Sequence, residues 1–176
     1  LVHLLGMPCD MDAILALAEH YNLKIVEDCA IALGTRYRDR HVGLFGEVGC
    51  FSFYPVKHIT AGEGGMVITR DPQVAQRINL LRAFGVDRNH GERLRPGQYD
   101  VVMLGLNYRM SELQAALGRS QLRRIDDILK QRRANFFALK SALSSCADVI
   151  VLDAPETESV NSHYCLSLLL TGALAR

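Results

Sequence analysis

Apolar and polar positions follow two different periods at the start of the chain. A short apolar stretch at residues 2–5 predicts a strand, and Asp10 precedes a segment whose apolar residues recur at helical spacing. Asn22 ends this helix, and a second strand is predicted at residues 24–26. Two strands joined by one helix pair in parallel through a right-handed crossover. The pattern therefore predicts an α/β fold.

Short strands dominate the next part of the chain. β-forming residues between glycine-containing turns predict strands at residues 35–37, 41–43, 50–53 and 66–69. Asp71 and Pro72 predict the N-cap and first turn of a helix that Gly85 stops. Residues 86–100 are charged and show no periodicity, which is typical of a long loop that is either functional or mobile.

The C-terminal half opens with a clear helix signal. The sequence SELQ at residues 111–114 is a capping box, and the helix after it is expected to break near residues 118–120 and to resume through Leu139. Strands are predicted at residues 149–152 and 164–170. We expect a large domain over residues 1–140 and the beginning of a smaller one over residues 141–176.

Composition and charge exclude several classes of protein. The 176 residues are 49% hydrophobic and 22% charged, as in an ordinary globular protein, and the net charge of +1 favours neither nucleic acid nor a membrane surface as partner. No apolar run approaches the roughly 20 residues of a membrane-spanning helix. The five cysteines are odd in number and form no CxxC pair, which argues against a disulfide framework and a metal site and favours the cytoplasm. The first residues resemble a strand entered midway, so we expect a fragment of a longer chain.

Two residues stand out as candidates for chemistry. Lys57 follows an apolar strand within SFYPVKH, and a lysine becomes a covalent catalyst when its surroundings favour the neutral amine. Asp28 ends the strand after the first helix, at the edge where parallel sheets bind ligands, although a turn carboxylate would also fit there. A lysine imine together with a carboxylate on the ring nitrogen is what pyridoxal-phosphate chemistry needs. We expect the neighbouring Glu27 to face solvent at the strand end.

The motifs around these two residues resemble a known family. Residues 26–71, VEDCAIALGTRYRDRHVGLFGEVGCFSFYPVKHITAGEGGMVITRD, and residues 104–116, LGLNYRMSELQAA, are similar to the DegT/DnrJ sugar aminotransferases, which are fold-type-I pyridoxal-phosphate enzymes. The signature is specific because all of its parts occur in the same order at compatible spacing. The resemblance implies an aspartate-aminotransferase-like large domain with a mostly parallel sheet, incomplete at its N-terminal side, plus the start of a small C-terminal α/β domain.

The resemblance also implies roles for individual residues. Lys57 would form the aldimine with pyridoxal 5'-phosphate and move the proton, Asp28 would contact the ring nitrogen, and Ser52 would bind the cofactor phosphate. Asn107 and Arg109 would reach across a homodimer interface toward the partner's cofactor phosphate or substrate. The implied reaction takes an amino group from glutamate, the amino-acid donor, and delivers it to a nucleotide-linked keto sugar, the nucleotide-sugar substrate.

Other positions leave alternatives open. Ile31 stands where the family usually has histidine or glutamine, which puts the detailed substrate or cofactor geometry in doubt. His58 is expected to point away from the site, and residues 62–65 (GEGG) to form a tight turn that lets backbone approach the cofactor. The long loop holds four basic residues with two equally open interpretations: they pair with a nucleotide diphosphate, or they are simply solvated. These residues are Arg88, His90, Arg93 and Arg95.

Three functional hypotheses remain at this point. Lys57 favours transamination over the dehydratase branch of the family, which has histidine in place of the lysine. A truncated and catalytically inactive piece of the same fold is the first alternative. Another fold-type-I enzyme, a lyase or a racemase, is the second, and it would share Lys57 and Asp28 but not the other motifs.

Overall fold

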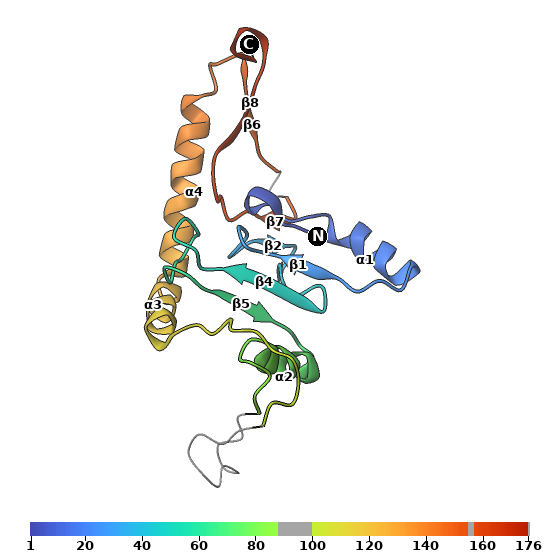
Figure 1. The fold of residues 1–176 in the computed structure, drawn as a ribbon. Helices are drawn as coiled ribbons and strands as arrows, with labels where there is room; N and C mark the ends of the chain where they lie inside the picture. The colour runs from blue at the N-terminus through green and yellow to red at the C-terminus, as the bar shows by residue number, and fades with distance from the viewer. Residues whose placement is uncertain (88–99, 155–156, 176) are drawn as a thin grey trace.

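A mixed three-stranded sheet forms the centre of the computed structural model, which describes residues 1–87, 100–154 and 157–175 (Figure 1). Its strands are β1 (Val26–Asp28), β4 (Val48–Ser52) and β5 (Gly65–Ile68), in the order β1-β4-β5. β1 and β4 run parallel, as the sequence predicts, whereas β5 pairs with β4 in the antiparallel sense. Val2 adds a parallel bridge to Asp28 on the other side of β1.

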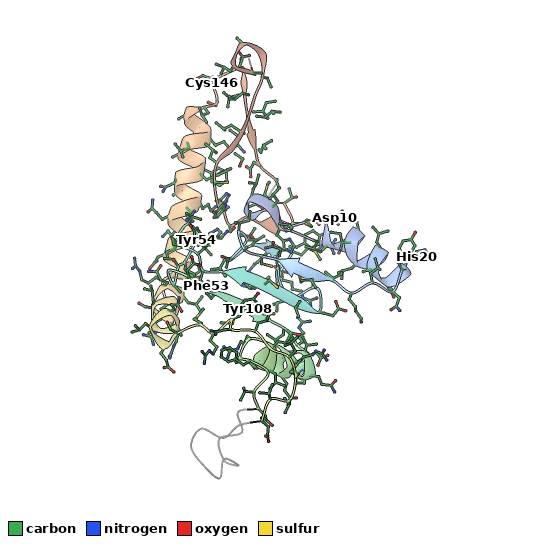
Figure 2. All side chains as sticks on the ribbon, in the orientation of Figure 1. Asp10, His20, Phe53, Tyr54, Tyr108 and Cys146 are labelled. Carbon is green, nitrogen blue, oxygen red and sulfur yellow. The ribbon has the colours of Figure 1, made fainter. Side chains whose placement is uncertain are left out.

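The N-terminal segment departs from the predicted strand at residues 2–5. Only Val2 pairs with β1, and Leu4–Gly6 form a turn of 3-10 helix. Leu5 and Gly6 have φ angles of 58° and 84°, and this left-handed backbone cannot continue a strand. The helix that follows, α1 (Met11–His20), is confirmed together with its N-cap, because the Asp10 carboxylate accepts the Ala13 N–H (Figure 2 labels Asp10 and His20 at its two ends).

A second sheet joins segments that are far apart in the sequence. Its strands β2 (Arg36–Tyr37), β3 (Arg40–His41) and β7 (Ser159–Val160) are antiparallel in the order β3-β2-β7. β7 was not expected, because its two residues are too few to show a strand pattern. The chain continues from β7 through residues 161–164, where the Ser162 N–H donates to the Gly6 carbonyl over 3.0 Å. The C-terminal part of the chain is thereby attached to the N-terminal part.

Three further helices surround the sheets. α2 (Pro72–Leu81) is capped by Asp71, and α3 (Glu112–Leu122) begins with the predicted capping box between Ser111 and Gln114. The expected break between two helices is present, but it follows Leu122 and does not lie near residues 118–120. α3 continues to Leu122, and the chain leaves helical geometry at Arg124, with φ −108° and ψ 10°, before α4 (Ile125–Ala142).

A two-stranded hairpin extends away from the central sheet beyond the end of α4 (Figure 1). It pairs β6 (Val149–Leu152), as predicted, with β8 (Ser167–Leu170), which starts later than expected, and it is followed by a 3-10 turn at Gly172–Ala175. α4 runs past residue 140, and β7 returns to β2 between the two hairpin strands. The domain division at residues 140 and 141 stays a prediction.

The two faces of the central sheet have different surroundings. Strand alternation and register place Glu27, Gly49 and Phe51 on one face, where Phe51 packs against the buried cluster of Cys29, Ala32 and Val42. An apolar groove of about 540 Å³ lies on this side, lined by Phe51, Phe53 and α4 residues such as Leu129. The other face carries Asp28, Cys50 and Ser52.

Among the described residues, every helix is too short or too polar to cross a membrane.

Candidate active site

Asp28 lies at the end of β1 on the open face of the sheet. Its carboxylate is exposed, and Oδ1 accepts the Ala30 N–H over 2.9 Å, which holds the side chain in one orientation. Its register partner in β4 is Cys50. Burial, and then the charge of Asp28, raise the pKa of the Cys50 thiol, so the thiol stays neutral beside the carboxylate. The acidic group is therefore available to a ligand on this face.

Ser52 lies two residues beyond Cys50, on the same face of β4. Its Oγ accepts the Tyr54 N–H over 3.3 Å, which leaves the hydroxyl proton free to be donated elsewhere. The residue opposite Ser52 in β5 is Gly65, which has no side chain to cover the hydroxyl. The carboxyl end of β4 thus presents a hydrogen-bond donor with open space next to it.

Lys57 lies on a compact turn that begins where β4 ends. The Lys57 N–H donates to the Tyr54 carbonyl over 3.0 Å, and the Ala61 N–H donates to the Phe53 carbonyl over 2.9 Å (Figure 2 labels Phe53 and Tyr54). The lysine is half-buried, and its Nζ lies 5.6 Å from the centre of the Tyr164 ring. The turn therefore holds the amine at the carboxyl edge of the sheet, against a residue from the C-terminal part of the chain.

His58 packs in the interior, as expected for a residue next to Lys57 that does not take part in chemistry. It is buried, its Nε2 donates to the Ser162 carbonyl over 3.2 Å, and its ring lies 5.5 Å from that of Tyr164. Burial, followed by the charge of Arg132, lowers the pKa of His58 to about 4, despite the Ser162 bond that favours the charged form. His58 thereby joins the Lys57 turn to residues 162–164 in its neutral form.

Two further expectations concern nearby backbone. The GEGG sequence forms a turn as predicted, with φ angles of 78° at Gly62 and 150° at Gly64, and the Phe53 N–H donates to the Gly64 carbonyl over 2.9 Å. The approach of this turn's backbone to a cofactor stays a prediction.

Ile31 is half-buried, and its carbonyl accepts the Ser162 hydroxyl over 3.4 Å. Its backbone therefore makes a polar contact that its side chain cannot make.

Asn107 and Arg109 are paired with each other. Arg109 Nε donates to Asn107 Oδ1 over 3.1 Å, and its guanidinium lies 4.7 Å from the centre of the Phe84 ring. Both residues are exposed, and no hydrogen bond within the described ranges joins them to Asp28, Ser52 or Lys57. The remaining substrate candidates, Arg88 and His90 with Arg93 and Arg95, lie outside the described residues.

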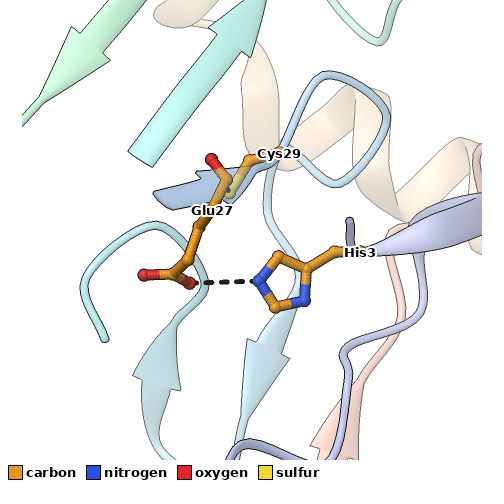
Figure 3. Close-up of side chains that lie close together, drawn as sticks. All are labelled: His3, Glu27 and Cys29. Atoms are coloured by element: carbon orange, nitrogen blue, oxygen red, sulfur yellow. Dashed lines mark hydrogen bonds and ion pairs between the residues drawn. The ribbon is translucent and has the colours of Figure 1, made fainter. Parts of the chain in front are cut away.

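Glu27 corrects the expectation that it faces solvent. It is completely buried, and its carboxylate accepts four N–H groups: those of His3 Nε2 (3.0 Å), Gly43 (2.6 Å), Phe45 (2.7 Å) and Gly46 (2.7 Å). Figure 3 shows the bond from His3. Burial alone would raise the pKa of Glu27, but these hydrogen bonds outweigh it and lower the pKa. The available signal was His3, a polar ring within an apolar stretch, which needs a buried partner.

The same cluster brings three groups together that could hold a metal ion. Ligand atoms of His3, Glu27 and Cys29 lie within 4.8 Å of one another. However, both oxygens of Glu27 accept N–H groups, and His3 Nδ1 accepts the Cys9 N–H over 3.1 Å. Burial and the charge of Glu27 raise the pKa of the Cys29 thiol to about 12, so it is not a thiolate ligand. The cluster is a hydrogen-bonded network of the protein itself.

Two sequence relatives and one solved structure are similar to this chain over almost all of its length. Lipopolysaccharide biosynthesis protein RfbH of Salmonella typhimurium is 35% identical over 97% of this chain and 43% of its own length. GDP-perosamine synthase of Escherichia coli O157:H7 is 37% identical over 97% of this chain and 44% of its own length. The structure of Helicobacter pylori PseC, an aminotransferase involved in the biosynthesis of pseudoaminic acid, superposes with a TM-score of 0.87 and 26% identity over 96% of this chain and 44% of PseC.

This chain therefore spans less than half the length of the relatives that it matches. Its α/β fold with a mixed sheet is the fold-type-I architecture of the sugar aminotransferases. The model of the DegT/DnrJ/EryC1/StrS aminotransferase family matches residues 1–175. The chain belongs to the DegT/DnrJ/EryC1/StrS aminotransferase family.

Proposed function

We propose that the protein containing this chain transfers an amino group from glutamate to a keto sugar linked to a nucleotide, using pyridoxal phosphate bound at Lys57. The observation that carries the proposal is the open face of the sheet, which presents Asp28 and Ser52 together, with Lys57 on the turn that follows β4. Membership of the aminotransferase family supports it. The name of GDP-perosamine synthase supports a nucleotide-linked sugar as substrate.

The residues on this face fit the cofactor. Pyridoxal phosphate requires a carboxylate for its ring nitrogen, donors for its phosphate and a lysine amine, and when bound it supplies an electron sink. The Asp28 carboxylate is exposed, and the Ser52 hydroxyl has a proton to donate beside the side-chain-free Gly65. The apolar groove lined by Phe51 lies on the opposite face, so it does not mark this site.

Each residue would have a separate task. The Asp28 carboxylate would accept the N–H of the ring nitrogen, while its Ala30 bond keeps it pointing away from the sheet. The Ser52 hydroxyl would donate to a phosphate oxygen. The Lys57 amine would hold the cofactor covalently until the amino group of the incoming donor displaces it. The freed amine would then act as the base that takes a proton from the substrate carbon and returns it to the cofactor carbon. The Tyr164 ring limits the positions that Nζ can take.

The proposal includes a homodimer with shared sites. Asn107 and Arg109 are exposed and lie in a segment whose apolar side chains also face outward, with Leu104 89% and Leu113 85% exposed. Such a surface is typical of one that is covered in the assembled protein. Asn107 and Arg109 would complete the partner's site, and Arg88 and His90 would contact the substrate. Activity is proposed for the full-length protein.

Covalent labelling tests the proposal directly. The full-length protein is loaded with pyridoxal phosphate, reduced with borohydride and digested, and the peptide containing Lys57 is expected to carry the pyridoxyl mass. Lys57→Ala is expected to lose the label and the amino transfer from glutamate to a nucleotide-linked keto sugar. Three lysines serve as internal controls, because they are exposed or paired with acids: Lys24 with Glu47, Lys130, and Lys140 with Asp153. A label on one of these in the native protein, or turnover in Lys57→Ala, would contradict the proposal.

A further inference from the structure

The backbone of Asp28 is held from both sides of β1. Its N–H donates to the Leu1 carbonyl over 2.9 Å, and its carbonyl accepts the His3 N–H over 3.1 Å. On the other side, the next N–H, that of Cys29, donates to the Cys50 carbonyl over 2.8 Å. The direction in which Asp28 reaches out of the sheet is therefore set by the segments that flank β1.

On the opposite face of the sheet, Glu27 fixes one of the segments that flank β1. Its carboxylate binds the N–H groups of Gly43, Phe45 and Gly46, which closes the loop before β4 beneath β1. The loop also packs directly on β4, because a side chain at Gly49, the register partner of Glu27, would overlap the backbone of Gly43. Only a carboxylate fits this position, since it accepts hydrogen bonds with both oxygens and offers no proton to the donors around it.

His3 connects Glu27 to Asp28. Its Nδ1 accepts the Cys9 N–H over 3.1 Å, so Nε2 carries the proton and donates to Glu27 over 3.0 Å. The backbone N–H of the same His3 binds the Asp28 carbonyl. Both side chains are completely buried. One residue therefore links the Glu27 network to the strand end that carries the exposed carboxylate.

We propose that Glu27 and His3 are positioning residues for Asp28. They hold the backbone from which the Asp28 carboxylate reaches the ring nitrogen of the cofactor, and they touch neither cofactor nor substrate. The inference rests on the proposed function, because it assigns the two residues to the cofactor site of that reaction. It differs from a purely structural role in one respect: the effect of Glu27 on the reaction must pass through Asp28.

Glu27→Gln is the first variant of the test, made in the full-length protein loaded with ¹⁵N-labelled pyridoxal phosphate. The glutamine amide turns N–H groups toward the N–H donors of the loop. The ring ¹⁵N resonance is expected to move toward that of the deprotonated ring, part of the way to the position found in Asp28→Ala. kcat is expected to fall about tenfold with little change in KM, as is typical when a residue that orients a binding side chain is lost. The double variant Glu27→Gln/Asp28→Ala is expected to be no slower than Asp28→Ala alone.

Three other variants serve as controls. Glu47→Gln neutralises a carboxylate that accepts the Ile25 N–H near the other end of β1, and it should leave the ring resonance and kcat unchanged. His3→Phe keeps a ring of similar shape but removes the donor to Glu27, and it should shift the resonance in the same direction as Glu27→Gln. His3→Gln, which retains a donor and an acceptor, should restore most of the wild-type signal. Thermal unfolding confirms that each variant is folded.

The outcomes separate the two proposals. Losses that multiply in the double variant, or an unchanged ring resonance in folded Glu27→Gln, would show that Glu27 does not act through Asp28, while the proposed function would stand. If Glu27→Gln does not fold, the His3→Phe and His3→Gln pair decides the question by the same resonance. Wild-type protein that binds no pyridoxal phosphate would contradict the proposed function, and the positioning role would fail with it.

Discussion

At the scale of single residues, the site depends on the alternation of one short strand. Glu27 and Asp28 are neighbours with opposite surroundings, one completely buried with four hydrogen-bond donors and the other exposed on the open face. A shift of β1 by one residue would exchange the two carboxylates between the faces. The register with β4 and the bridge to Val2 therefore determine which acid is presented to a ligand.

Substitution of Asp28 tests its assignment to the ring nitrogen. In the full-length protein, Asp28→Ala should still allow the cofactor to bind at Lys57, but turnover should fall on the order of a hundredfold because developing charge is no longer stabilised. Asp28→Asn is the matched control, since its amide oxygen can keep the bond to the Ala30 N–H. Turnover and cofactor content are measured together. Wild-type turnover in Asp28→Asn would mean that the residue serves only the turn.

At the scale of elements, local signals were sufficient for the starts of three helices, but insufficient for the end of α3 and for much of the strand pairing. Asp10, Asp71 and Ser111 mark the starts of α1, α2 and α3 because an N-cap acts within its own first turn. β7 depends on a partner strand far away in the sequence, so no pattern within its own residues could reveal it.

The candidate site was predictable to a similar extent. The strand-end position of Asp28 and the turn position of Lys57 follow from local sequence and from the family motif. The burial of Glu27 could not be predicted without knowing that residues 43–46 fold back beneath β1 and that His3 lies against it. Those contacts are set by tertiary structure.

His58 gives a test of how firmly the elements are joined. Its pKa of about 4 in the folded protein lies below the value of about 6.5 expected when unfolded, so its contribution to stability is complete above pH 6.5 and is lost as the pH falls toward 4. For the wild type, the free energy of unfolding should therefore drop by about 2 kcal/mol more between pH 7 and pH 5 than for His58→Gln.

Urea unfolding at the two pH values measures this difference. His20→Gln is the control, because it removes an exposed histidine at the end of α1 in place of the buried one. Glu27 does not interfere, since its lowered pKa means that its contribution is lost only below about pH 4.3. Equal pH dependence in wild type and His58→Gln would contradict the neutral, buried state of His58.

At the scale of the whole molecule, the proposed shared site predicts that inactive subunits complement each other. Lys57→Ala mixed under subunit exchange with the Asn107→Ala/Arg109→Ala double variant should regain up to one working site in each mixed dimer. The matched control mixes Lys57→Ala with Asp28→Ala, in which every site lacks one essential residue from the same subunit, so no activity should return. Activity that stays absent while mass spectrometry shows mixed dimers would contradict the shared site.

The return of β7 to the sheet of β2 limits how the chain can be shortened. A chain cut after α4 loses the hairpin, but it also loses the third strand of that sheet and the Ser162 carbonyl that binds His58. Water would then reach the buried histidine next to Lys57, and the Tyr164 ring would no longer lie beside the lysine amine. The smallest piece of this protein that retains a native Lys57 environment must therefore extend through Tyr164.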